Sequence, residues 1–248
     1  MNALPPLKRN SVVLVVGPRG SGKTVLATEL ARAQRHVTVF DTKLDFSWND
    51  PHPYYGLTAY NVEDVLKCWR GIEAQGDGAP VIYRPDVGSP SFHADVDRVA
   101  AIALQRKNCL LYYDELADIC SVSNYERVAP SYKRAVMQGR SLGVGVWQVT
   151  QRPARIPLIA YTEADLRATF FLRSKSDRDR VEEYMGEVPW RQLAITDHAF
   201  VYSDDKLAQS DEPLQPHRLI LPHPPQRSAN YGEQGRSQNV LAGRSAAS

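Results

Sequence analysis

Short runs of apolar and β-branched residues alternate along most of the chain with segments whose apolar residues recur at helical spacing. The run at 11–16 ends at Gly17 and is typical of a strand that is buried on both faces. This alternation predicts an α/β domain with a mainly parallel sheet. The predicted strands are 11–16, 36–40, 80–83, 109–113, 144–150, 168–172 and 198–202, and the predicted helices are 24–34, 62–74, 92–107 and 126–140.

Three side chains bear on where these helices begin. Asn61 and Ser91 immediately precede helical patterns and are residue types favoured at N-caps. Pro130 lies inside the pattern at 126–140, and we expect it to disturb the first turns there because proline lacks an N–H donor.

The character of the sequence changes near residue 210. We assign residues 1–210 to one domain and 211–225 to a proline-rich extension, in which 216–221 is a candidate edge strand. Residues 226–248 are rich in Ser, Gly, Gln, Asn and Ala, with little apolar surface to bury. We therefore expect that tail to be disordered, or ordered only by a partner.

Composition narrows the class of protein. The 248 residues include 30 Lys and Arg and 28 Asp and Glu, which argues against a generic polybasic nucleic-acid binder. Locally the charge is uneven, since 41–126 is acidic and 127–180 is basic.

No apolar run is long enough to span a membrane, and no signal-peptide pattern is visible. Three unpaired cysteines suggest neither disulfides nor zinc, so we expect a cytoplasmic protein.

A glycine-rich segment follows the first predicted strand and precedes the first predicted helix. It fits G-x-x-x-x-G-K-[ST], the phosphate loop whose backbone N–H groups surround the phosphates of a nucleotide. The lysine of this motif contacts the β- and γ-phosphates, and the hydroxyl binds Mg²⁺. The pattern therefore predicts binding of ATP with Mg²⁺ by Gly17, Pro18, Arg19, Gly20, Ser21, Gly22, Lys23 and Thr24.

Two carboxylates end the apolar strand at 109–113. Carboxyl ends of parallel strands share one sheet edge, so Asp114 can meet Thr24 around one Mg²⁺ ion. Glu115 can polarise a water molecule as a general base, which makes water the expected acceptor. This arrangement resembles the additional-strand, catalytic-glutamate class of P-loop ATPases, which have a RecA-like fold. That class places the strand at 144–150 between the other two, with Gln151 near the γ-phosphate as a sensor.

The segment 139–153, GRSLGVGVWQVTQRP, makes the resemblance more specific. It is similar to the signature of the FtsK–HerA superfamily of ring-forming DNA translocases, which typically ends in A-T-Q-R-P, although Val149 replaces the alanine. Weaker similarities lie at 40–43, which resembles the Asp-x-Lys after the second strand, and at 165–180. The resemblance covers roughly residues 10–205.

That resemblance implies a ring of five or six identical subunits that moves double-stranded DNA through its centre. The compact length is similar to that of viral and phage genome-packaging ATPases, which would make a capsid portal or vertex protein a possible partner. Ring ATPases of this class usually complete the site with a neighbouring subunit's arginine. Arg140 is the preferred candidate, with Arg167 and Arg173 as alternatives, and Arg19 could instead contact phosphate within its own subunit.

Contacts to DNA need basic side chains that hold the phosphate backbone without reading bases. The candidates are Lys133, Arg134, Arg152 and Arg155. A different function that these residues allow is that of a P-loop kinase, which would use the last two as a phosphate lid. The resemblance is also compatible with a motor for plasmid or chromosomal DNA and with an assembly protein of filamentous phages.

Overall fold

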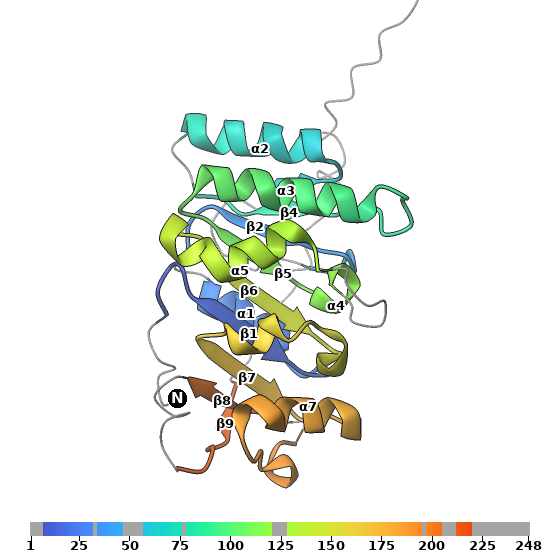
Figure 1. The fold of residues 1–248 in the computed structure, drawn as a ribbon, viewed down its shortest axis with the longest axis vertical. Helices are drawn as coiled ribbons and strands as arrows, with labels where there is room; N and C mark the ends of the chain where they lie inside the picture. Colours follow the sequence, from blue (N-terminus) through green and yellow to red (C-terminus); the bar gives the residue numbers. More distant parts are fainter. Residues whose placement is uncertain are drawn as a thin grey trace, which may run out of the picture.

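The computed structural model describes residues 7–31, 34–46, 57–75, 78–120, 128–194, 197–204 and 212–219. These residues form a nine-stranded sheet in the order β3-β4-β2-β5-β6-β1-β7-β8-β9, flanked by helices (Figure 1). In this order, all strands from β3 through β7 are parallel to one another. Strand β8 is antiparallel to β7, and β9 is antiparallel to β8. The strands are β1 (Val12–Val16), β2 (Val37–Phe40), β3 (Leu57–Ala59), β4 (Val81–Tyr83), β5 (Leu110–Tyr113), β6 (Gly145–Thr150), β7 (Leu166–Phe170), β8 (Ala199–Asp204) and β9 (His217–Arg218).

Strand β6 lies between β1 and β5, which confirms the expected position of the additional strand. Val16 is in register with Thr150, and Tyr113 with Gln148. The three strands run parallel, so the residues that follow each of them emerge at one edge of the sheet. We call this edge, where β1, β2, β5, β6 and β7 end, the carboxyl edge.

Helices cover both faces of the sheet (Figure 1). Side chains at alternate positions of β1 belong to two different cores: Leu14 belongs to the core that also contains residues of α2, α3 and α5, whereas Val13 belongs to the core on the other face, which contains residues of α1. The helices are α1 (Lys23–Ala31), α2 (Val62–Gln75), α3 (Phe92–Arg106), α4 (Leu116–Ile119), α5 (Pro130–Leu142), α6 (Ile159–Thr162) and α7 (Lys175–Met185), with short 3₁₀ turns η1 (Pro153–Arg155) and η2 (Trp190–Gln192). The mainly parallel α/β prediction is confirmed.

The helix starts differ in how well the sequence predicted them. Asn61 caps α2, because its Oδ1 accepts a hydrogen bond of 2.8 Å from the Asp64 N–H. Ser91 occupies the N-cap position of α3, but its hydroxyl donates to the Asp95 carboxylate instead of accepting from a backbone N–H. Pro130 begins α5 and does not disturb an earlier turn, because the first helical position needs no N–H donor. The predicted start of this helix at residue 126 was therefore wrong.

Part of the proline-rich extension packs on the domain. Its residues His217 and Arg218 form β9 at the edge of the sheet, as the sequence predicted for 216–221, and Leu214 and Leu219 are buried. The expected tail at 226–248 lies outside the described residues. Among the described helices, none has the length and apolar character needed to cross a bilayer.

Candidate active site

The phosphate loop joins β1 to α1 at the carboxyl edge. Gly20 and Gly22 have φ angles of +77° and +96°, which side chains rarely adopt. Gly17 is needed for space, because a Cβ there would lie 2.6 Å from Ser21 Oγ and 3.0 Å from Phe170 Cβ. The sequence therefore folds this segment into a tight loop that leads directly into the N-terminus of a nine-residue helix.

Two groups of the loop suit a bound triphosphate. Lys23 is only 6% exposed, and its Nζ contacts the Pro18 carbonyl oxygen at 3.5 Å. Burial, followed by the neighbouring Lys43 ammonium, lowers the pKa of Lys23. Ser21 Oγ is also buried, and within the described part of the chain it has no hydrogen-bond partner. A phosphate oxygen would give the Ser21 hydroxyl a partner and the Lys23 ammonium a charged one.

Thr24 and Asp114 meet across the carboxyl edge, with the Thr24 hydroxyl donating to Asp114 Oδ1 at 3.3 Å. Asp114 is 3% exposed, and desolvation raises its pKa to about 6 even though Lys43 and Lys23 oppose the shift. Such a carboxylate gains from a cation that replaces its lost hydration. A hydroxyl beside a carboxylate is the oxygen ligand pair that Mg²⁺ takes in phosphate-loop proteins, so the residues fit that ion.

Glu115 is 4% exposed and makes a dense set of hydrogen bonds. Its Oε1 accepts from the Thr150 hydroxyl at 2.5 Å, and its Oε2 accepts from Lys43 Nζ at 2.6 Å. The Gln151 backbone N–H lies 3.1 and 3.2 Å from the two oxygens. Strand β6 therefore holds the candidate general base through its final residues.

Lys43 is a charged group of the site to which the sequence motifs assigned no role. It lies just beyond β2, within the segment 40–43 noted as similar to an Asp-x-Lys motif, and that similarity was the available signal. In the same segment Asp41 pairs with Arg84 at 2.9 Å, and its carboxylate lies near those of Asp45 and Asp114, with ligand oxygens within 4.8 Å of one another. The end of β2 thus contributes charged groups next to the predicted site.

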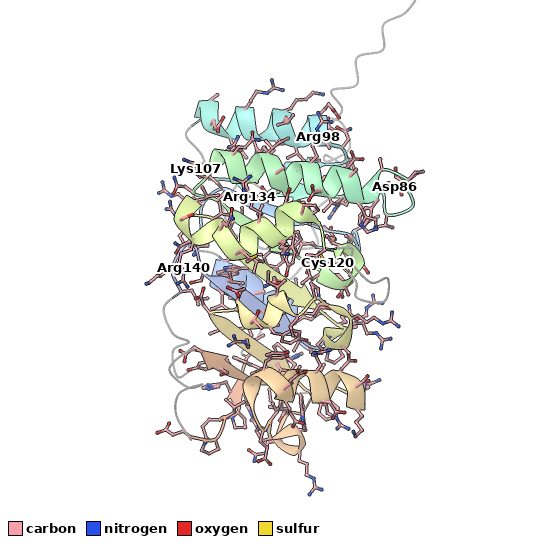
Figure 2. All side chains as sticks on the ribbon, in the orientation of Figure 1. Asp86, Arg98, Lys107, Cys120, Arg134 and Arg140 are labelled. Carbon is pink, nitrogen blue, oxygen red and sulfur yellow. The ribbon has the colours of Figure 1, made fainter. Side chains whose placement is uncertain are left out.

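The structure separates the arginines predicted to complete the site. Arg19 is exposed on the phosphate loop, and Arg173 is exposed just beyond β7 at the same edge. The Arg167 Nε donates to the Tyr161 carbonyl oxygen at 2.8 Å. Arg140 lies near the opposite edge, where β1 and β6 begin (Figure 2), and pairs with Asp165 of its own chain at 2.5 Å. Its role in a neighbouring subunit stays a prediction.

The candidate DNA contacts fall in two places. Lys133 and Arg134 are exposed on α5 over one face of the sheet. Arg152 and Arg155 lie beyond β6 and line a cavity of about 270 Å³ together with Lys43, Glu115, Ala117, Asp118 and Gln151. The second pair is therefore adjacent to the candidate base, and the first pair is on a helix surface.

The chain is similar in fold to solved structures of B204, the genome-packaging NTPase of Sulfolobus turreted icosahedral virus 2. With sulfate bound, that structure matches with a TM-score of 0.63 at 19% identity, over 88% of this chain and 100% of B204. Its complex with AMPPCP matches with a TM-score of 0.61 at 18% identity, over 86% of this chain and 100% of B204. The fold is that of a RecA-like P-loop ATPase domain.

A second B204, the DNA-packaging ATPase of Sulfolobus turreted icosahedral virus, matches with a TM-score of 0.61 at 17% identity, over 86% of this chain and 99% of that one. No protein-family model matches the sequence, and no curated protein matches it significantly. At these identities the likeness describes the fold. The activity has to be argued from the site.

Proposed function

We propose that this protein hydrolyses ATP and uses the energy to move double-stranded DNA, most specifically to package a viral or phage genome. The observation that carries the proposal is the meeting of Lys23, Thr24, Asp114 and Glu115 at one sheet edge. The similarity of the fold to the B204 packaging proteins and the resemblance of 139–153 to DNA translocases support the DNA substrate.

Each residue has a separate task in this proposal. The loop N–H groups, Ser21 and Lys23 hold the phosphates. Thr24 and Asp114 hold Mg²⁺, which would supply positive charge to the phosphoryl oxygens. Glu115 accepts a proton from the attacking water, and the Gln151 side chain, which is half-buried at the end of β6, orients that water. No protein group becomes covalently modified.

The DNA-moving unit in this proposal is a homo-oligomeric ring of five or six subunits, docked at a capsid portal or vertex in the host cytoplasm. Arg140 reaches the neighbouring subunit's nucleotide, where its charge stabilises the transition state. This use of Arg140 requires it to leave Asp165. An ion pair with an arginine side chain that is 75% exposed is weak enough to exchange.

ATP turnover measured with and without double-stranded DNA tests the proposal. Glu115→Gln and Lys23→Ala should each lower turnover by at least about 100-fold, since each removes a group that acts on the phosphates or the water. Glu63→Gln, an exposed carboxylate change at the start of α2, is the matched control and should leave the rate unchanged.

Imaging of the protein with DNA and a non-hydrolysable ATP analogue tests the ring. A ring with a DNA-sized central hole supports the translocase. Wild-type turnover in Glu115→Gln would refute the base assignment, and phosphorylation of a small acceptor by a monomer would replace the proposal with a kinase.

A further inference from the structure

Three donors contact the carboxylate of Glu115 and occupy both of its oxygens. A carboxylate offers about four lone-pair positions on its two oxygens. Here Oε1 faces the Thr150 hydroxyl and the Gln151 N–H, and Oε2 faces Lys43 Nζ and the same N–H. A general base must accept a hydrogen bond from the water that it activates. Each oxygen is contacted by two donors, one of them the shared N–H, so the departure of one donor would open a position for that water.

Lys43 is the donor that can leave. Thr150 is the last residue of β6 and is in register with Val16 of β1, and Gln151 follows it directly, so both donors are held by the sheet. Lys43 instead lies beyond the end of β2, its side chain is 25% exposed, and it is carried by a long flexible stem. Its ammonium therefore has room to move without disturbing the sheet.

The cavity that Lys43 lines shows where its ammonium can go. Arg152 and Arg155 line the same space of about 270 Å³. Within the described residues neither guanidinium has an ion-pair partner. Asp118 is the opposing charge in the cavity besides Glu115, and its Oδ2 accepts from the Thr42 hydroxyl at 2.7 Å. Cations thus outnumber carboxylates, which favours an anion.

We propose that this cavity, the Lys43 pocket, binds a phosphate group, and that Lys43 is a positioning residue which moves from Glu115 to that phosphate. The exchange replaces one charge-assisted hydrogen bond by another, so it needs no large energy input. It frees Glu115 Oε2 for water. ATP hydrolysis is then slow while the pocket is empty and fast when it is filled. The coupling rests on the proposed ATPase function.

Two sources can supply the phosphate group: the backbone of DNA or inorganic phosphate. Both can be titrated into protein saturated with a non-hydrolysable ATP analogue, which keeps them out of the phosphate loop. The amide signal of Gln151 in a heteronuclear NMR spectrum is the readout, because this N–H donates to Glu115. The pocket is supported if the titration shifts this signal and if Arg155→Gln lowers the affinity obtained from the titration by about tenfold. The source that produces the shift identifies the ligand.

Turnover measurements test the coupling. Lys43→Met keeps the length of the side chain but removes its charge, and it should raise turnover without DNA by about tenfold, corresponding to one charge-assisted hydrogen bond. If DNA is the source, it should add no further stimulation in this variant, whereas Lys43→Arg should retain stimulation. Lys67→Met, which removes an exposed charge on α2, is the control and should behave as wild type.

The outcomes distinguish a failure of the proposed phosphate pocket from a failure of the proposed ATPase function. If wild-type protein does not hydrolyse ATP, the proposed function fails, and the NMR titration still tests the phosphate site. If the wild type is active but Lys43→Met retains its low basal rate, the coupling is wrong. If neither phosphate source shifts the Gln151 amide in the wild type, the pocket is not a phosphate site.

Discussion

The Thr24 hydroxyl donates a hydrogen bond to Asp114 Oδ1 at 3.3 Å, although 90 positions separate the two residues in the chain. The contact forms because β1 and β5 run parallel and release their following residues at one edge, with β6 between them. It brings together the two side-chain oxygens that we propose as Mg²⁺ ligands.

Removal of either the Thr24 hydroxyl or an Asp114 carboxylate oxygen should strongly lower metal-dependent turnover. Thr24→Val keeps the shape of the side chain, and Asp114→Asn keeps one acceptor oxygen, so both proteins should fold. We expect turnover to fall by about 100-fold or more, because the ion is worth several kcal/mol to the transition state. Turnover measured against Mg²⁺ concentration checks this. Thr58→Val, at an exposed position of β3, is the control, and an equal loss there would show a general folding defect.

Ligand-free stability should depend on pH through Asp114. Its pKa is about 6 in the fold and near 3.8 in the unfolded chain, so the folded state binds more protons between these values. Asp114 therefore destabilises the fold as pH rises from about 4 to above 6, by about 3 kcal/mol in full. Asp114→Asn should be the more stable protein at pH 8 and lose that advantage near pH 4. Urea unfolding at both pH values measures it, and equal differences at the two values would contradict the assignment.

A methyl group on Gly17 should damage the phosphate loop. Its Cβ would lie 2.6 Å from Ser21 Oγ, so Gly17→Ala forces the loop to shift at a cost of about 1–3 kcal/mol. Nucleotide affinity should fall with it. Gly71→Ala is the matched control, because this glycine lies in α2 with nothing within 4 Å of the added atom. That change should stabilise the protein by about 0.5–1 kcal/mol. Thermal unfolding and nucleotide titration measure both variants.

Arg140 should act only between subunits. Arg140→Ala breaks an exposed ion pair, so the free energy of unfolding should change by at most about 1 kcal/mol. Turnover should nevertheless fall by about 1,000-fold if the guanidinium completes a neighbour's site. Arg70→Ala removes an exposed arginine of α2 and should have little effect on turnover. Mixing inactive Arg140→Ala with inactive Glu115→Gln subunits should restore partial activity, and a mixture that stays inactive would place Arg140 outside the site.

Two residues that flank β8 and β9, His198 and Leu219, should support the phosphate loop. Leu219 Cδ2 lies 3.0 Å from the position of a Cβ on Gly22, and His198 Nδ1 is 3.0 Å from the Ser21 carbonyl oxygen. Leu219→Ala should cost about 2 kcal/mol or more of stability and weaken nucleotide binding. Leu158→Ala, at a residue 52% exposed, should change neither quantity appreciably. Unchanged nucleotide affinity in Leu219→Ala would show that Leu219 does not support the loop.

Local patterns predicted the strands and the phosphate loop well, because both depend on residues adjacent in the chain. Periodicity located β1, β5 and β6, and the motif at 17–24 specified its own glycines. The first turn of α5 was misjudged because proline has opposite effects inside a helix and at its first position. Short elements such as β3 and α4 have too few residues to show a period.

The sequence by itself determined the chemistry: a phosphate loop, a carboxylate pair after a buried strand and a polar strand end. Only the tertiary structure decided which charges meet. Lys43 pairs with Glu115 because β2 is the neighbour of β5, and the pair is 72 positions apart in the chain. Strand order in a parallel sheet is fixed by how helices pack on its two faces, and no local spacing encodes it. For that reason the partner of the candidate base emerged only from the fold.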